Sequence, residues 1–273
     1  MPTADIDSVR KYWNENPLLS FELAKPGSAE FFYELDRAKR EDSEVFAMPY
    51  WEFDKFKGKT VLDVGCGPGW VTVQYASGGA DVFSVDLTPR AVEIARIFLG
   101  QRGLNAVVAE GNAEQLQFPD CSFDLVVSSG VLHHTPDTEK AIRECYRVVK
   151  HDGRAKLTFY FKGVLHSSWM FPVTRLVMRI AGVKHPGADL AKEAQDVDDF
   201  IRQYDGAFNP VGVGHTINGW ERILRAAGFV IERHEVHFFP RRFIPVKQFI
   251  PRFVHRLCDR WFGTMVYFDL KKV

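Results

Sequence analysis

Short apolar runs alternate with amphipathic segments through the first two thirds of the chain. The runs are rich in β-branched residues, as buried strands are, and they cover residues 61–64, 80–86, 105–109, 125–129 and 154–161. Between them, apolar residues recur at helical spacing, as in the segments 70–76, 89–99 and 137–149. Parallel strands need crossover connections, which are usually helices. The pattern therefore predicts an α/β fold with a mostly parallel sheet.

The flanking segments continue this pattern less regularly. We expect helices over residues 5–14 and, after Ser28, over 31–46, which together precede the first strand. Later helices are expected over 167–181, 191–204 and 218–227, and two last strands over 229–238 and 264–270. The expected organisation is an N-terminal helical lid over 1–58 and one domain over 59–273, with insertions at about 162–215 and 240–263.

The chemistry is concentrated where the first strand ends, in the stretch VLDVGCGPG at 61–69. Gly65, Gly67 and Gly69 permit a tight turn and have no side chain to keep a ligand away. A dinucleotide-binding fingerprint would need a third glycine at position 70, which is Trp70 here. The glycine turn nevertheless predicts a nucleotide-type pocket between the strand and the helix that follows.

Asp86 ends the second strand, 21 positions after Gly65. In nucleotide-binding folds an acidic residue about 20 positions on meets the ribose hydroxyls, and a carboxylate can accept from both. The alternative is a solvated acid at a strand end, and the interval favours the binding role. After Asp86, Thr88 as N-cap and Pro89 at the first helical position predict the start of a helix.

Composition narrows the choice of partner. The chain has 35 Lys plus Arg and 35 Asp plus Glu, so no excess of positive charge indicates nucleic acid, and a small molecule is the expected partner. The four cysteines form no C-x-x-C pair, so we expect no metal site and no disulfide framework. Neither a signal peptide nor a transmembrane run is present, which predicts a cytoplasmic protein.

The stretch D-x-G-x-G-x-G at 63–69 resembles motif I of the class I S-adenosylmethionine-dependent methyltransferases. The segments GNAE at 111–114 and GVLHHTPD at 130–137 are also similar to that family. The resemblance implies a Rossmann-like sheet of seven strands with the last strand antiparallel, helices on both faces, and S-adenosylmethionine as cofactor. It implies cofactor contacts by a set of strand-end residues, namely Asp63, Gly65, Cys66, Gly67, Gly69, Asp86, Leu87, Asn112, Ala113 and Ser128.

Family members often close an N-terminal helix over the cofactor, and this role would fall to Tyr12 and Trp13 here. Aromatic rings exclude water and favour a cation over their faces. The alternative, which we favour for the N-terminal segment as a whole, is a packing cover. For Asn112, which would meet the adenine edge with an amide that both donates and accepts, the alternative is an ordinary Asx turn.

His133 is the candidate catalytic residue. In the resembled family its position faces the methyl acceptor, and histidine has the side chain best suited by its pKa to remove a proton near neutral pH. The alternative is structural, with one ring of the His133–His134 pair capping the next helix and the other packed. The sequence leaves this open.

The nearest resemblance is to the ubiquinone/menaquinone-biosynthesis-like methyltransferases, which implies a small-molecule acceptor. The 23 phenylalanines suggest a hydrophobic or aromatic acceptor, whose attacking atom (O, S, N or C) the sequence does not specify. Candidate lining residues for its pocket are Tyr160, His166, Trp169, Tyr204 and His215.

Residues 240–263 contain a basic and aromatic segment. Phe249, Phe253, Leu257 and Trp261 recur at helical spacing, and arginines take a neighbouring face. Such a segment suits a peripheral membrane contact, but a helix that covers the sheet edge or a subunit contact is the interpretation we favour. The oligomeric state is not specified by the sequence.

Two other functional classes stay open. A nicotinamide-dependent oxidoreductase is disfavoured by Trp70 at the third glycine position. A non-catalytic scaffold that binds S-adenosylmethionine is the other alternative, and retained binding without turnover on any acceptor would support it.

Overall fold

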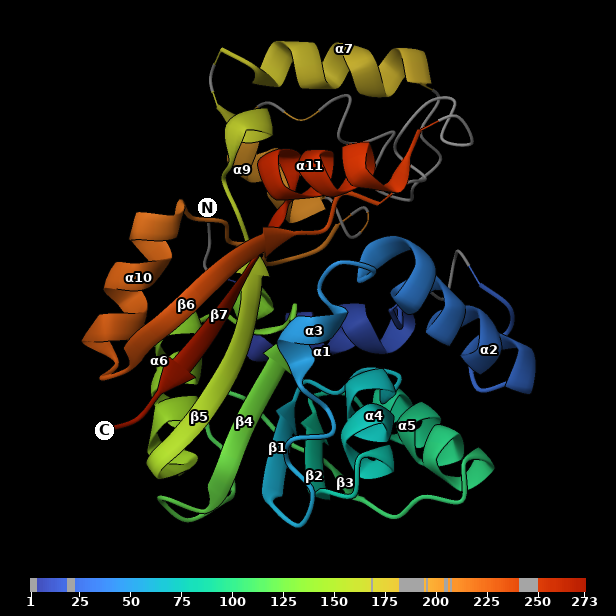
Figure 1. Cartoon of the computed structure of the whole chain (residues 1–273), viewed down its shortest axis with the longest axis vertical. Helices are drawn as coiled ribbons and strands as arrows, with labels where there is room; N and C mark the ends of the chain where they lie inside the picture. Colours follow the sequence, from blue (N-terminus) through green and yellow to red (C-terminus); the bar gives the residue numbers. More distant parts are fainter. Residues whose placement is uncertain are drawn as a thin grey trace.

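The computed structural model describes residues 4–18, 23–167, 169–181, 194, 196–203, 206, 208–240 and 250–273. Seven strands form one sheet in the order β3-β2-β1-β4-β5-β7-β6 (Figure 1). The strands are β1 (Thr60–Val64), β2 (Asp81–Asp86), β3 (Val107–Glu110), β4 (Phe123–Ser129), β5 (Val149–Tyr160), β6 (Val230–His237) and β7 (Met265–Lys271). Strands β1 to β5 pair in parallel, and β7 pairs antiparallel with both β5 and β6. The predicted fold class is confirmed.

Helices cover both faces of this sheet, as Figure 1 shows. The helices from β1 onward are α4 (Trp70–Ser77), α5 (Pro89–Gln101), α6 (Thr138–Val148), α7 (Phe171–Ala181), α9 (Val197–Gln203), α10 (Ile217–Ala226) and α11 (Arg252–Phe262). Neighbouring side chains of a strand point to opposite faces, so Val61 joins the apolar cluster under α4 and α5 while Leu62 joins the cluster under α6 and α10. This burial on both faces explains why the strands read as continuous apolar runs.

The two helices that frame the site begin where the sequence predicts. The Thr88 hydroxyl accepts from Ala91 N at the start of α5, and the Asp137 carboxylate accepts from Lys140 N at the start of α6. Each N-cap satisfies a backbone donor that has no partner within its helix, which is worth about 1 kcal/mol.

The N-terminal segment contains α1 (Ile6–Glu15), α2 (Ala29–Ala38), a π-helical turn η1 (Lys39–Ser43) and a short helix α3 (Met48–Trp51). Here the structure differs from the single long helix expected over 31–46, because α2 ends at Ala38. Phe31, Phe32 and Leu35 of α2 are buried in the core with Trp51 of α3. This part of the segment therefore packs as a cover over the domain.

Strand β5 begins five residues before the predicted strand. Residues 151–153, whose His-Asp-Gly sequence predicts a turn, lie within β5 as an irregularity, since Phe123 is paired with Val149 and Leu125 with Arg154. Asp152 takes a left-handed conformation there, with φ of +61°. Among the described residues, none of the helices combines the length and the hydropathy that a bilayer crossing needs.

The two predicted insertions are described in part. Between β5 and α10 lie a 3-10 turn η3 (Val164–His166), α7 and α9, and between β6 and β7 lies α11. The helix expected over 191–204 is seen only as α9, and Tyr204 falls outside the described residues, as do 182–193 and 241–249, which include Phe249.

Candidate active site

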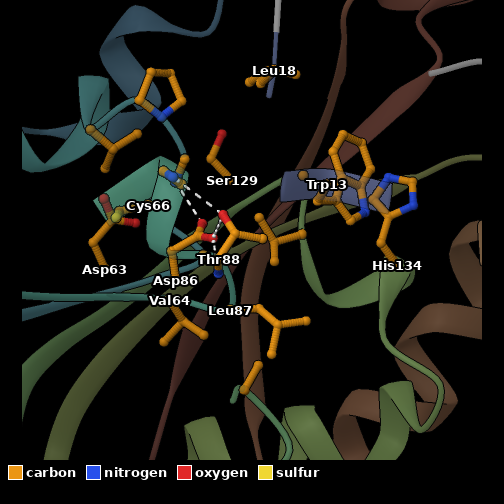
Figure 2. A pocket seen from close by; sticks show the side chains of 18 of the residues that line it. Trp13, Leu18, Asp63, Val64, Cys66, Asp86, Leu87, Thr88, Ser129 and His134 are labelled. Atoms are coloured by element: carbon orange, nitrogen blue, oxygen red, sulfur yellow. Dashed lines mark hydrogen bonds between the residues drawn. The ribbon is translucent and has the colours of Figure 1, made fainter. Parts of the chain in front are cut away.

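A cavity of about 200 Å³ opens where β1, β2 and β4 end. The carboxyl ends of parallel strands are where this kind of sheet binds its ligands. Its walls come from the glycine turn, the ends of β2 and β4, the turn η2 (Leu132–His134) and helix α1 (Figure 2). The cavity therefore gathers segments that are far apart in the sequence.

The glycine turn between β1 and α4 needs the backbone freedom of its glycines. Gly65 has φ of +76°, and a Cβ on it would lie 2.3 Å from Cγ1 of Val131. Gly67 has φ of +51°, and no atom lies within 4 Å of the position that its Cβ would take. Gly69 caps α4 with φ of +83°, packs against Ala95 and does not line the cavity. The turn thus leaves open space over Gly67, where a ligand can approach the backbone.

Asp86 connects the end of β2 to the glycine turn. Its Oδ2 accepts from Gly67 N at 2.9 Å, and its Oδ1 accepts from Thr88 N at 2.9 Å and from the Thr88 hydroxyl at 3.0 Å. Burial raises the pKa of this carboxyl, and the hydrogen bonds from Thr88 and Gly67 partly offset that effect. A carboxylate has about four acceptor positions, so Asp86 retains capacity for a ligand hydroxyl.

Asp63 is a second acid in the cavity wall and is almost fully buried. Burial raises its pKa to about 7, the hydrogen bond from the Thr72 hydroxyl at 2.7 Å opposes the rise, and Asp86 adds to it. The carboxyl of Asp63 is therefore poised to ionise near neutral pH. A cation bound in the cavity would favour its charged form.

Lys39 and Glu44 line the same end of the cavity, although the sequence analysis missed them. Lys39 Nζ lies 3.1 Å from Glu44 Oε1, and Glu44 Oε2 accepts from Trp51 Nε1 and from the Tyr267 hydroxyl. In the sequence both residues stand in a charged stretch that reads as a solvated helix face. Only the packing of η1 against the domain turns them inward, and no local signal identifies them.

Three predicted cofactor contacts follow the ends of β2 and β3, and one of them also forms a turn in the backbone. Leu87, Asn112 and Ala113 all line the cavity. The Oδ1 atom of Asn112 accepts from Glu114 N at 2.9 Å, which is the Asx turn that stood as the alternative interpretation. The turn uses the amide oxygen, so the NH₂ group is the part of Asn112 that the turn leaves for a ligand.

His133 lies in the cavity wall and is fully buried. Within the described part of the chain its ring nitrogens lack a well-formed hydrogen bond, but the backbone of Thr158 interacts with the ring and opposes the fall of its pKa. Burial first, and then the neighbouring His134, hold the pKa of His133 well below 6.5. The ring is neutral at neutral pH and can accept a proton, although burial disfavours its charged form.

His134 and Trp13 pack edge-on against each other on one side of the cavity (Figure 2), with ring centroids 5.0 Å apart. The Nδ1 atom of His134 lies 2.7 Å from the carbonyl oxygen of Val211, which ties the turn η2 to the second half of the chain. Trp13 of α1 thus packs against the segment that carries His133. The N-terminal helix supplies part of the cavity wall, with Ile6 and Val9 beside Trp13.

Two residues predicted to contact the cofactor, Ser128 and Tyr12, do not line the cavity, whereas their sequence neighbours Ser129 and Trp13 do. Ser128 is buried and donates to Val64 O at 2.8 Å, whereas Ser129 lines the cavity, because successive side chains of a strand face opposite ways. Tyr12 does not line the cavity, although its ring packs edge-on against Trp13 at 5.2 Å. Adjacent residues of a helix diverge by about 100°, so only one of them faces inward.

The residues predicted to line one acceptor pocket lie in different parts of the structure. Tyr160 lines the main cavity, with its ring centroid 4.1 Å from that of His133. His166 lines a second, small pocket on the other side of Tyr160, and His215 packs against Trp220. Trp169 is 69% exposed and lines neither. Phe238 and Met265, which the sequence analysis did not single out, line the main cavity instead.

Comparison with known proteins gives a domain family for the centre of the chain. Residues 62–157 match the family model described as a methyltransferase domain. The chain is 38% identical over 102 residues to an uncharacterized methyltransferase, YcgJ, of Bacillus subtilis, covering 37% of this chain and 40% of that protein. It is 36% identical over 157 residues to a ubiquinone biosynthesis O-methyltransferase of Pseudomonas entomophila, covering 56% and 63%. The chain thus spans less than two thirds of the length of these relatives.

A solved structure extends the likeness of the fold. The S-adenosylmethionine-dependent methyltransferase of Mesorhizobium loti superposes with a TM-score of 0.55 at 19% identity, covering 82% of this chain and 96% of that one. At this identity the likeness concerns the fold, which is that of the class I methyltransferases.

Proposed function

We propose that this chain, whose residues 62–157 belong to the methyltransferase domain family, transfers a methyl group from S-adenosylmethionine to a small apolar or aromatic acceptor. The observation that carries the proposal is the link between Asp86 and Gly67 at the wall of a single cavity. It joins the glycine turn and the acid of β2, the two features that the family uses for its cofactor.

The residues present suit this cofactor. The free space over Gly67 admits a ligand to the backbone, Asp86 retains acceptor capacity, and Asn112 retains its NH₂ group at the same wall. Asp63 brings a further carboxyl group, which favours a ligand with positive charge, whereas the charge of Glu44 is balanced by Lys39 at 3.1 Å. Gly65, Cys66, Leu87 and Ala113 line the wall between these polar groups and complete the proposed site.

When bound, S-adenosylmethionine supplies an activated methyl group on a sulfonium centre. The protein's own contribution is then alignment of the acceptor in a site that excludes water. Trp13 and His134 form one side of that site, and His133 with Tyr160 forms the neighbouring side. For an acceptor that holds a proton, we propose His133 as the proton acceptor, because its ring is neutral and lines the cavity.

The acceptor end of the cavity supports an apolar or aromatic substrate. Its described lining includes Trp13, Leu18, Tyr160, Phe238 and Met265. The relatives named for ubiquinone biosynthesis are O-methyltransferases, which makes a hydroxyl on an aromatic ring the first acceptor to test.

The proposal is tested with purified chain and methyl-labelled S-adenosylmethionine against a panel of catechols, hydroquinones, thiols and amines. We expect label transfer to at least one ring-hydroxylated member of the panel, with saturable binding of the cofactor by calorimetry. Saturable binding without transfer to any member would support the non-catalytic scaffold. The absence of binding in a folded protein would contradict both.

The affinity for S-adenosylmethionine is expected to rise roughly eightfold between pH 6 and pH 7.5. The pKa of Asp63 is about 7 without ligand, and a cationic ligand lowers it, so binding releases a proton below pH 7 and strengthens as the pH rises. Calorimetry at several pH values measures this, with Asp63→Asn as the control, because the variant keeps the shape but cannot ionise. Equal pH slopes in the two proteins would contradict the role of Asp63.

His133→Gln is expected to lower kcat on a hydroxyl acceptor about a hundredfold and to leave the affinity for S-adenosylmethionine within about twofold. The pKa of His133 lies well below 6.5, so we also expect kcat at saturating S-adenosylmethionine to show no histidine-like loss near pH 6.5. The matched control is His151→Gln, which changes an exposed histidine of β5. An unchanged kcat in His133→Gln would mean that this ring only packs.

A further inference from the structure

Helix α11 is amphipathic, but it turns its polar side to the domain and its apolar side to the surface. Its polar residues His255 and Asp259 are buried, while Phe253, Leu257 and Trp261 are 68%, 55% and 67% exposed. These three residues are four positions apart, so they form one apolar stripe along the helix. A helix on the surface of a domain normally turns such a stripe to the core.

The polar side is held to the domain by specific hydrogen bonds. Asp259 Oδ2 lies 2.6 Å from Nδ1 of His237, at the end of β6, and Asp259 Oδ1 accepts from Phe239 N at 2.9 Å. His255 Nε2 lies 2.8 Å from the carbonyl oxygen of Phe239. The pKa of His237 is raised to about 9: burial lowers it, but the hydrogen bonds with Asp259 and Glu235 outweigh burial. The ion pair is therefore formed at neutral pH, and it fixes which side of α11 faces outward.

A row of arginines accompanies the exposed stripe. Arg252, Arg256 and Arg260 each precede one stripe residue and are exposed, and Arg256 also packs over the ring of Phe46 at 5.3 Å. The only acid within the helix is Asp259, which is buried and paired. The outer surface of α11 therefore combines positive charge with large apolar side chains, two of which are aromatic.

This surface lies at the end of the molecule next to the cavity. Figure 1 shows α11 and α7 beyond the ends of β5, β6 and β7, and both helices pack against η3. Helix α7 exposes an apolar pair of its own, Val173 at 49% and Leu176 at 55%. The residues that bracket the α11 segment, Phe238 and Met265, line the main cavity. An apolar molecule held at this surface would be near the acceptor end of the site.

We propose that α11 docks on the surface of a lipid bilayer that carries anionic headgroups, with its apolar stripe in the interface and its arginines at the headgroups. Aromatic and aliphatic side chains beside basic ones are what an interfacial helix needs, and the positive row complements an anionic surface. A second copy of this chain would bring the same positive row against itself in a two-fold contact, whereas an anionic bilayer neutralises that row. The proposal deepens the proposed function, on which it rests only in naming the membrane as the source of a lipophilic acceptor.

The test is flotation of the full chain with vesicles of phosphatidylcholine alone and of phosphatidylcholine mixed with phosphatidylglycerol, without cofactor or acceptor. We expect binding to the mixed vesicles, weakened by added salt and weak on the neutral ones. Arg252→Gln with Arg260→Gln should weaken binding to the mixed vesicles roughly thirtyfold. Phe253→Glu with Trp261→Glu should abolish binding to both kinds of vesicle.

Matched controls change equally exposed residues elsewhere. They are Arg143→Gln with Arg225→Gln, on α6 and α10, and Tyr33→Glu on α2, whose side chain is 66% exposed. These variants should bind vesicles as the unmodified chain does. Binding that is equal in the α11 variants and the controls would overturn the proposal, as would no binding to mixed vesicles.

The same preparations separate this inference from the proposed function. Light scattering that finds a dimer in the unmodified chain and a monomer in Phe253→Glu with Trp261→Glu, without vesicle binding by either, would assign the stripe to a second copy and overturn the proposal. Calorimetry with S-adenosylmethionine should give the same affinity in the α11 variants. Loss of vesicle binding with intact cofactor binding in these variants is the supporting result, whereas absence of cofactor binding in every protein would concern the proposed function alone.

Discussion

Asp86→Ala is expected to reduce the affinity for S-adenosylmethionine and for its demethylated product at least roughly thirtyfold, about 2 kcal/mol. The carboxylate is proposed to receive hydroxyls of the ligand, and hydrogen bonds to a charged group are the stronger kind. It also anchors Gly67 N and Thr88 N, so its removal loosens the glycine turn as well. Calorimetric titration of both ligands measures the loss.

Two further variants show which of these roles matters. Asp81→Ala changes an exposed acid at the opposite end of β2, and we expect it to leave both affinities unchanged. Asp86→Asn keeps the shape of the side chain and one acceptor oxygen. Its loss of affinity for the two ligands should therefore lie between those of Asp86→Ala and Asp81→Ala. If Asp86→Ala binds both ligands normally, the cofactor does not occupy this wall, and the methyltransferase proposal loses its main support.

Asp269→Ala is expected to lower the free energy of unfolding by roughly 3–5 kcal/mol. Asp269 is buried in β7, and its Oδ2 lies 3.2 Å from Lys156 Nζ and 3.2 Å from Arg233 Nε, with Arg154 also in contact. Lys156 is fully buried, so the variant leaves a charged ammonium with Glu52 as its remaining carboxylate partner among the described residues. Breaking a buried ion pair on one side costs far more than losing a pair on the surface.

Chemical denaturation of three proteins tests this second expectation. Asp120→Ala removes a surface partner of Arg147 whose side chain is 74% exposed, and it should cost no more than about 1 kcal/mol. Combining Asp269→Ala with Lys156→Met also removes the buried ammonium and should restore part of the stability. Equal effects of Asp269→Ala and Asp120→Ala would show that the buried cluster contributes little to stability.

The local signals in the sequence predicted most of the fold and the proposed cofactor wall. Thr88 and Asp137 begin their helices as expected, because an N-cap acts within one turn of the chain. The interval from the glycine turn predicted a ligand contact for Asp86, and in the structure Asp86 meets Gly67 because adjacent parallel strands end at the same edge of the sheet. The irregularity in β5 was missed, since a His-Asp-Gly sequence suits a turn and only the pairing with β4 draws it into the strand.

Which side of an element faces inward was decided by the tertiary structure. The resemblance implied a cofactor contact for Ser128, but the depth of the strand end determines that Ser129 is the one that reaches the cavity. The sequence likewise concealed Lys39 and Glu44, which become cavity residues only when the N-terminal segment packs on the domain.

Helix α11 shows most clearly what the sequence determined and what the tertiary structure decided. Its sequence determined that apolar and polar residues occupy different faces, because a helical period fixes their relative directions. It did not determine which face is buried: a helix that covers the sheet edge or a subunit contact was favoured without an orientation, and in the structure α11 packs against the edge strand β6 with its polar side inward. The partners His237 and Phe239 lie in a segment that precedes the helix, and their hydrogen bonds to Asp259 and His255 hold the polar side inward. Period is a property of the local chain, whereas orientation depends on what the fold places beside it.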